Sequence, residues 1–278
     1  MSGARIKSII IAALLLINIL FLTVIIIDAV DDARSERETI ENISAILRGG
    51  GITINPDNIT TAGPIRTMRT SRVPEVEENI ARVFLGEAVM TDQGIIYLYE
   101  NAHGMAEFGS TGYFVIRMNP DVITSSGDAI RTVQTLLRDM QIETNGVTEL
   151  SDQDDGTETL VAVGAYRGAR IFNCTVEFIF IGNSLNTVQG RYVAGIESHE
   201  DGVEISQVGT ALLGFLSAVR DELREDVDCT EIFGVESGFR HRVVGNFGEG
   251  VIEPAWLIST DNGQFLIDDT TGEIWPWF

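Results

Sequence analysis

Cysteine, histidine and lysine are scarce in this chain of 278 residues, which limits the chemistry that its side chains can perform. The two cysteines do not define a metal site. His103, His199 and His241 stand in turn-like or strand contexts, and no spacing places one beside a particular serine or cysteine. The Walker, dinucleotide-binding, HExxH, GxSxG and SxxK motifs are absent as well. We therefore expect a non-enzymatic protein with no catalytic residue, no cofactor and no metal ion.

Basic residues are also few, because 19 Lys and Arg stand against 41 Asp and Glu, for a formal net charge of −22. Arg5 and Lys7 precede the first acidic residue, Asp28, so the rest of the chain is more acidic still. A surface of this sign repels nucleic acid and anionic phospholipid headgroups. We therefore expect no nucleic-acid partner.

One long apolar run covers residues 9–27, with no charge and with only Asn18 and Thr23 as polar side chains. A helix of this length spans roughly 28 Å, close to the hydrocarbon thickness of a bilayer. The run is longer than that of a cleaved signal peptide, and no good small-x-small cleavage site follows it. These features predict a transmembrane helix over residues 8–28, in contact with the lipid bilayer.

The charges that flank this run predict its orientation. Arg5 and Lys7 precede it and Asp28 follows it, which keeps the segment 1–7 in the cytoplasm. We therefore expect a single-pass protein of the cell membrane whose C-terminal domain is extracellular. Asn18 could bond a neighbouring helix in the membrane, or it could be a tolerated polar residue. We name it as a candidate partner contact.

The outward portion contains both cysteines, Cys174 and Cys229. An extracytoplasmic location permits a disulfide between them. Two buried thiols fit the sequence equally well, so both readings stay open.

A juxtamembrane helix is predicted within residues 29–50. Ser35 and Glu38 have capping-box spacing, and three glycines at 49–51 end the periodic pattern. The narrow apolar stripe suits either a coiled coil with a partner or packing on the domain that follows. Its members, Ile40, Ile43 and Leu47, are candidate partner contacts.

Beyond residue 50, a helical pattern followed by several strands recurs three times, over residues 51–124, 125–203 and 204–278. The helical patterns lie near residues 74–86, 125–140 and 206–225. In the second of them, the apolar residues expected to face inward are Ile130, Val133, Leu137 and Met140. The chain is therefore predicted to be α+β, with a transmembrane helix and repeated helix-plus-antiparallel-meander units.

Two acidic stretches could hold a metal ion but fit turns better. Asp268 and Asp269 lie in a stretch that could offer oxygens to Ca²⁺, but the EF-hand register is missing. The sequence 261–263 (Asp-Asn-Gly) suits a two-residue hairpin, and 199–202 (His-Glu-Asp-Gly) suits a polar turn. Four apolar residues should share the buried face of the 261–263 hairpin. They are Trp256, Ile258, Phe265 and Ile267.

Three segments resemble a known family: "YRGARIFNCTVEFIF" (166–180), "SGFRHRVV" (237–244) and "IEPAWLISTDNGQFLIDDTTGEI" (252–274). Together they resemble the YycI-type regulatory proteins of Gram-positive bacteria and, more loosely, their YycH companions. The resemblance implies a non-enzymatic accessory of a membrane sensor histidine kinase that governs cell-wall metabolism, contacted through the membrane span and the extracytoplasmic domain. It also implies a possible YycH-like companion.

The closing meander, residues 204–278, also resembles PepSY-type modules. This implies an alternative function as an extracytoplasmic binding or peptidase-inhibitory module. An enzyme that uses carboxylate chemistry is a further alternative, for which no spacing pairs two particular carboxylates.

Overall fold

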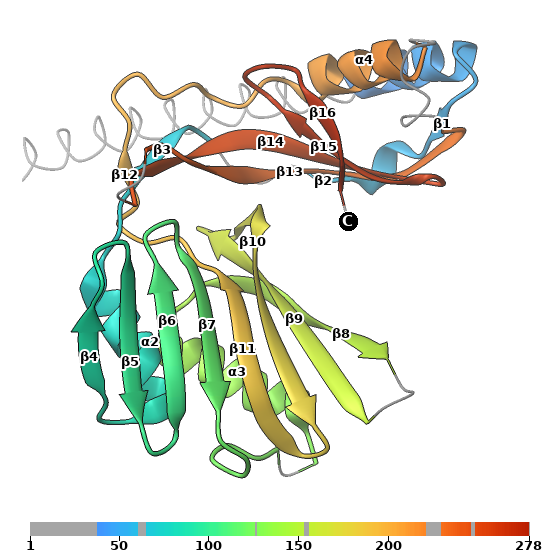
Figure 1. Cartoon of the computed structure of the whole chain (residues 1–278). Helices are drawn as coiled ribbons and strands as arrows, with labels where there is room; N and C mark the ends of the chain where they lie inside the picture. Colours follow the sequence, from blue (N-terminus) through green and yellow to red (C-terminus); the bar gives the residue numbers. More distant parts are fainter. Residues whose placement is uncertain are drawn as a thin grey trace, which may run out of the picture.

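The computed structural model describes residues 38–60, 65–125, 127–152, 156–220, 229–245 and 248–277. Its strands form one connected sheet in two lobes, one above the other in Figure 1. We call residues 74–191 the central lobe. The terminal lobe combines residues 38–70 with residues 197–277, so it draws on both ends of the described chain.

The central lobe contains an antiparallel sheet with the strand order β4-β5-β6-β7-β11-β10-β9-β8. Helix α2 (Pro74–Leu85) precedes the first four strands, and α3 (Ala129–Met140) precedes the last four. The two halves join where β7 pairs with β11. The strands are β4 (Val89–Asp92), β5 (Ile96–Asn101), β6 (Gly104–Gly109), β7 (Tyr113–Met118), β8 (Thr144–Asp152), β9 (Thr157–Tyr166), β10 (Ala169–Ile181) and β11 (Ser184–Arg191).

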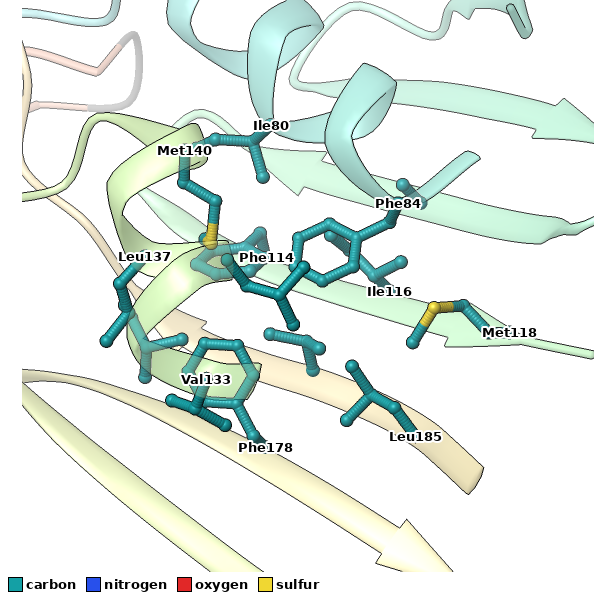
Figure 2. Packing of buried hydrophobic residues seen from close by; sticks show 14 of the residues in the cluster. Ile80, Phe84, Phe114, Ile116, Met118, Val133, Leu137, Met140, Phe178 and Leu185 are labelled. Atoms are coloured by element: carbon teal, nitrogen blue, oxygen red, sulfur yellow. The ribbon is translucent and has the colours of Figure 1, made fainter. Parts of the chain in front are cut away.

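Helices α2 and α3 cover one face of this sheet and form the largest hydrophobic cluster with it (Figure 1). Figure 2 shows Phe84 of α2 and Val133 of α3 pointing to the same layer of strand side chains. Burying a large apolar side chain stabilises the fold by about 1.5–3 kcal/mol. Ile130 was expected in this layer, but it is 39% exposed. That expectation is wrong, because the buried stripe of α3 runs through Leu136 instead.

The terminal lobe has a mixed sheet around a long antiparallel hairpin of β13 (Glu231–Val243) and β14 (Gly250–Thr260). On its other side, β13 pairs in parallel with β1 (Thr53–Ile54), with β2 (Ile59–Thr60) and, at one residue, with β10. A short 3-10 helix, η1 (Pro56–Asn58), lies between β1 and β2. The strands that extend β14 are β3 (Met68–Thr70), β12 (Glu197–Ser198), β15 (Gly263–Asp268) and β16 (Ile274–Trp277).

Two helices lie side by side over the terminal sheet (Figure 1): the helix of residues 38–49, and α4 (Val208–Val219). Ile43 and Leu47 of the first helix are buried in one cluster with Phe215 of α4 and with strand residues. A Cβ at Gly209 would overlap the Ile43 side chain, so this glycine lets the two helices approach closely. The stripe of helix 38–49 therefore packs on the domain that follows it.

The predicted architecture of repeated helix-plus-meander units is wrong. The first two sets of strands share one sheet, since β7 and β11 would otherwise leave unpaired backbone edges. The strands of the third set belong to a mixed sheet. In it, β13 pairs in parallel with β1 and β2, which lie within residues 53–60. The predicted span over residues 8–28 lies outside the described residues. Within the part of the chain that is described, no helix is long and apolar enough to cross a bilayer.

Candidate functional site

A cleft lies where the end of the central sheet meets the terminal lobe. It contains a cavity of about 300 Å³, lined by the ends of β9 and β11, the start of β10 and the segment after α3. A larger groove of about 590 Å³ adjoins it and shares Tyr166 and Ile196 with it. We call the cavity and the groove together the inter-lobe cleft. The apolar wall of the cavity includes Ile142, Tyr166, Ile171, Val193 and Ile196.

The β9–β10 hairpin forms one rim of this cleft, and its turn is held by a carboxylate. Arg167 and Gly168 both have positive φ, at 51° and 81°, which is the conformation of a tight hairpin turn. The Glu143 carboxylate accepts hydrogen bonds from the backbone N–H groups of Arg167 (3.1 Å) and Gly168 (2.7 Å). Glu143 also lines the cavity. Its carboxylate already accepts hydrogen bonds from two backbone N–H groups.

Arg191, the last residue of β11, contributes the basic group of the cavity. Four arginines of the described chain are partly buried, and three of them pair with a carboxylate. These pairs are Arg72–Glu77, Arg170–Glu236 and Arg240–Asp268. Arg191 makes no ion pair or side-chain hydrogen bond with any residue that the structure describes.

Arg191 influences two buried titratable groups, Cys174 and His241. Burial, opposed by the positive charge of Arg191, raises the pKa of the Cys174 thiol to about 12. Burial, reinforced by the same charge, lowers the pKa of His241 to about 4. Both groups are therefore neutral at pH 7. The His241 ring reaches the Thr70 hydroxyl through Nε2 at 3.3 Å, while its buried Nδ1 has no hydrogen-bond partner among the described residues.

The inner wall beside Arg191 is fixed by a buried ion pair. The fully buried Glu77 carboxylate of α2 accepts two hydrogen bonds from Arg72, at 2.7 and 2.8 Å, and one from the Tyr192 hydroxyl at 2.8 Å. The Arg72 guanidinium also lies 3.9 Å from the centre of the Tyr97 ring. Because Tyr192 follows Arg191 directly, this network holds the end of β11 in place.

The acidic C-terminal stretch forms turns and caps in the structure. Asp261 accepts hydrogen bonds from Thr230 and from the backbone N–H of Glu231. Asp269 accepts from Ser206 and from the Trp256 indole. No group of three or more His, Cys, Asp or Glu side chains in the described ranges could hold a metal ion.

The hairpin predicted from the 261–263 sequence is present, and its loop is Asp261-Asn262 between the paired Thr260 and Gly263. Only Gly263 of the three turn residues has positive φ, at 124°. The four apolar residues expected to share its buried face are all in one hydrophobic cluster, which confirms that prediction. They are Trp256, Ile258, Phe265 and Ile267.

The candidate partner contacts have mostly intramolecular neighbours. Ile43 and Leu47 are buried, and Ile40 packs partly buried against the same cluster. Asn18 lies outside the described residues, and the role of all four residues toward a partner stays a prediction. Cys174 and Cys229 are buried in different clusters and are not joined by a disulfide.

Arg191 was missed in the sequence, because nothing local marks it. It ends a strand in the segment "VQGRYVAG", and the residues that complete its surroundings lie up to 115 positions away. The exposed Arg117 and Arg131 look the same in the sequence. Only the fold separates an arginine that lines a cavity from one on the surface.

No family model matches this chain, and a search of curated proteins finds no match to its sequence. The resemblance to YycI-type proteins therefore rests on the sequence features given above and stays a prediction.

Proposed function

We propose that the chain is a membrane-anchored, non-enzymatic accessory protein of the cell membrane. It would regulate a sensor histidine kinase of a cell-wall-related two-component system through transmembrane and extracytoplasmic contacts, with a YycH-like companion as a further partner. The resemblance of residues 166–180 and 237–274 to YycI-type proteins supports this function. The apolar run at residues 9–27 supports the anchor.

One structural observation carries the proposal: the helical residues 38–49, where the described chain starts, belong to the core of the terminal lobe. Ile43 and Leu47 are 5% and 0% exposed there. A displacement of this helix would therefore disturb a packed interior rather than a loose linker. Such a coupling suits a protein that links a membrane helix to an extracytoplasmic domain.

The outer side of the same helical layer offers apolar side chains to a partner. Ile46 of helix 38–49 is 48% exposed, and Leu213 of α4 is 44% exposed. Helix 38–49 is the described helix closest in sequence to the proposed anchor, and α4 packs against it. Ile46 and Leu213 are thus suitable positions for extracytoplasmic contact with a kinase.

The test is co-purification of the full chain from detergent-solubilised membranes of its own host. Three versions are compared: the wild type, a chain with residues 9–27 scrambled in order but still apolar, and the double variant Ile46→Glu/Leu213→Glu. The wild type should retain a histidine kinase, and the scrambled or double variant should retain less. Failure of the wild type and the scrambled chain to retain any histidine kinase contradicts the proposal.

The inter-lobe cleft favours a second candidate function, an extracytoplasmic binding module of the PepSY-like kind. The two functions predict different gene neighbours. A response-regulator and kinase pair beside this gene would support the first function, whereas a peptidase gene would support the second.

A further inference from the structure

We propose that the inter-lobe cleft binds a small amphipathic monocarboxylate, with the carboxylate on Arg191 and the apolar body along the cavity wall. This site goes beyond the proposed regulatory function and does not depend on it. It needs neither a membrane partner nor a kinase.

The charge balance around Arg191 points to an anion. Each of the other partly buried arginines in the described chain lies within 3.2 Å of a carboxylate oxygen, since a guanidinium that loses water needs such a partner. Arg191 has lost part of its water and has no such partner. In a chain with 41 acidic residues, a partly buried arginine with no described carboxylate at ion-pair distance is explained by an anion that comes from outside.

The surroundings select a single negative charge. Cys174, which lines the cavity with Arg191, and His241 are both neutral at pH 7 and add no second cation. Glu143 lines the same cavity and would repel a dianion such as phosphate about twice as strongly as a monoanion at the same distance. A carboxylate carries one charge and matches the planar guanidinium through two parallel hydrogen bonds.

The rest of the cavity selects an apolar body. Ile142, Ile171, Val193 and Ile196 line it together with the Tyr166 ring. Its volume of about 300 Å³ is at the lower end of the range for small-molecule sites, which combine apolar walls with a few placed polar groups. The adjoining groove, through Tyr166 and Ile196, gives the ligand a route to solvent.

Two sources share this chemistry: a free organic acid, and the C-terminal carboxylate of a short apolar peptide. The experiment therefore uses 4-phenylbutyrate as the first probe and an N-acetylated Leu-Phe dipeptide as the second. The uncharged controls are 4-phenylbutyramide and the amidated dipeptide. Binding to the full chain in lipid nanodiscs is measured by saturation-transfer NMR titration, with empty nanodiscs to subtract partition into lipid.

The wild type should bind at least one acid in a saturable manner, and its amide should bind at least about tenfold more weakly. The acid that binds more tightly shows whether the ligand is a free organic acid or the C-terminus of a peptide. Arg191→Gln should weaken binding of the acid by about tenfold or more, and Arg191→Lys should fall between. Arg131→Gln, which removes the same charge from an exposed site on α3, should leave binding unchanged.

Ile196→Trp provides a second variant that keeps every charge and fills the shared wall of the cavity and groove. Ile196→Trp should also abolish saturable binding. Circular dichroism checks that each variant is folded. If Arg191→Gln is unfolded, Ile196→Trp still tests the proposal. Saturable binding of neither acid to the wild type overturns the proposal. Equal binding of acid and amide, or unchanged binding in folded Arg191→Gln, overturns it as well.

Discussion

Ile171 of β10 stands directly opposite Phe239 of β13, and this parallel bridge joins the central sheet to the terminal sheet. The two strands also approach closely at Arg170 and Phe172, the residues that flank Ile171. An added Cβ at Gly238 would come within 2.6 Å of the Arg170 carbonyl oxygen and of the Phe172 ring. Glycine at 238 therefore permits the two strands to meet.

The first prediction concerns this junction. Gly238→Ala should destabilise the fold by about 1–3 kcal/mol, because the methyl group has to displace backbone and a buried ring. Urea denaturation of the full chain measures the change. Gly214→Ala is the matched control, since no atom lies within 4 Å of its added Cβ. On the exposed side of α4 this control should be neutral or stabilising by up to about 1 kcal/mol. Equal effects of the two substitutions would contradict the structure.

The second prediction concerns helix 38–49. Leu47→Ala should cost about 2–5 kcal/mol of the free energy of unfolding, because Leu47 is fully buried in the cluster that it shares with α4. Ile46→Ala, one position earlier and 48% exposed, should change it by no more than about 0.5 kcal/mol. Thermal and urea unfolding of both variants provide the comparison. A small loss in Leu47→Ala would show that this helix does not belong to the folded core.

The third prediction concerns the Arg72–Glu77 ion pair. Glu77→Gln leaves the Arg72 guanidinium buried without its counter-charge and should cost about 3–5 kcal/mol. Glu78→Gln, on the exposed side of the same helix, should have little effect. Chemical denaturation distinguishes the two variants. A Glu77→Gln protein as stable as the Glu78→Gln protein would contradict the assigned network.

The fourth prediction is a pH dependence set by His241. Its pKa is lowered by burial to about 4, from 6.5 in the unfolded chain, so between these values the unfolded state binds more protons than the folded state. The contribution of His241 to stability is therefore fully present above pH 6.5 and is lost as the pH falls toward 4. The total loss is about 3 kcal/mol.

Urea denaturation at pH 7 and at pH 4.5 measures this effect. His241→Gln should reduce the difference in stability between the two pH values. An unchanged pH dependence in His241→Gln would contradict the buried, neutral state of this ring.

Local sequence signals predicted individual elements well. Pro74 and Gly86 mark the two ends of α2, because proline fits the first turn of a helix and a glycine with positive φ fits its end. The alternation on either side of Asp261 predicted which residues of that hairpin are buried. In both cases the deciding interactions lie within a few residues of one another.

The arrangement of those elements was not predictable in the same way. The pairing of β7 with β11 joins residues more than 65 positions apart, and any exposed strand edge could have been the partner. Arg191 and Glu143 reach one cavity only because β11 and the α3–β8 segment end at the same margin of the sheet. Non-local pairing of this kind leaves no pattern in a single sequence.

Strand β10 has a mechanical consequence for the molecule. Ile171 pairs with β13, whereas Ala169, Arg170 and the last seven residues of β10 pair with β9, with a register shift between Arg170 and Thr175. One continuous strand, not a loop, therefore sets the separation of the lobes. A wide opening of the inter-lobe cleft would therefore have to bend β10 or break its pairing with β13. Ligands that enter the inter-lobe cleft without breaking this pairing must therefore be small.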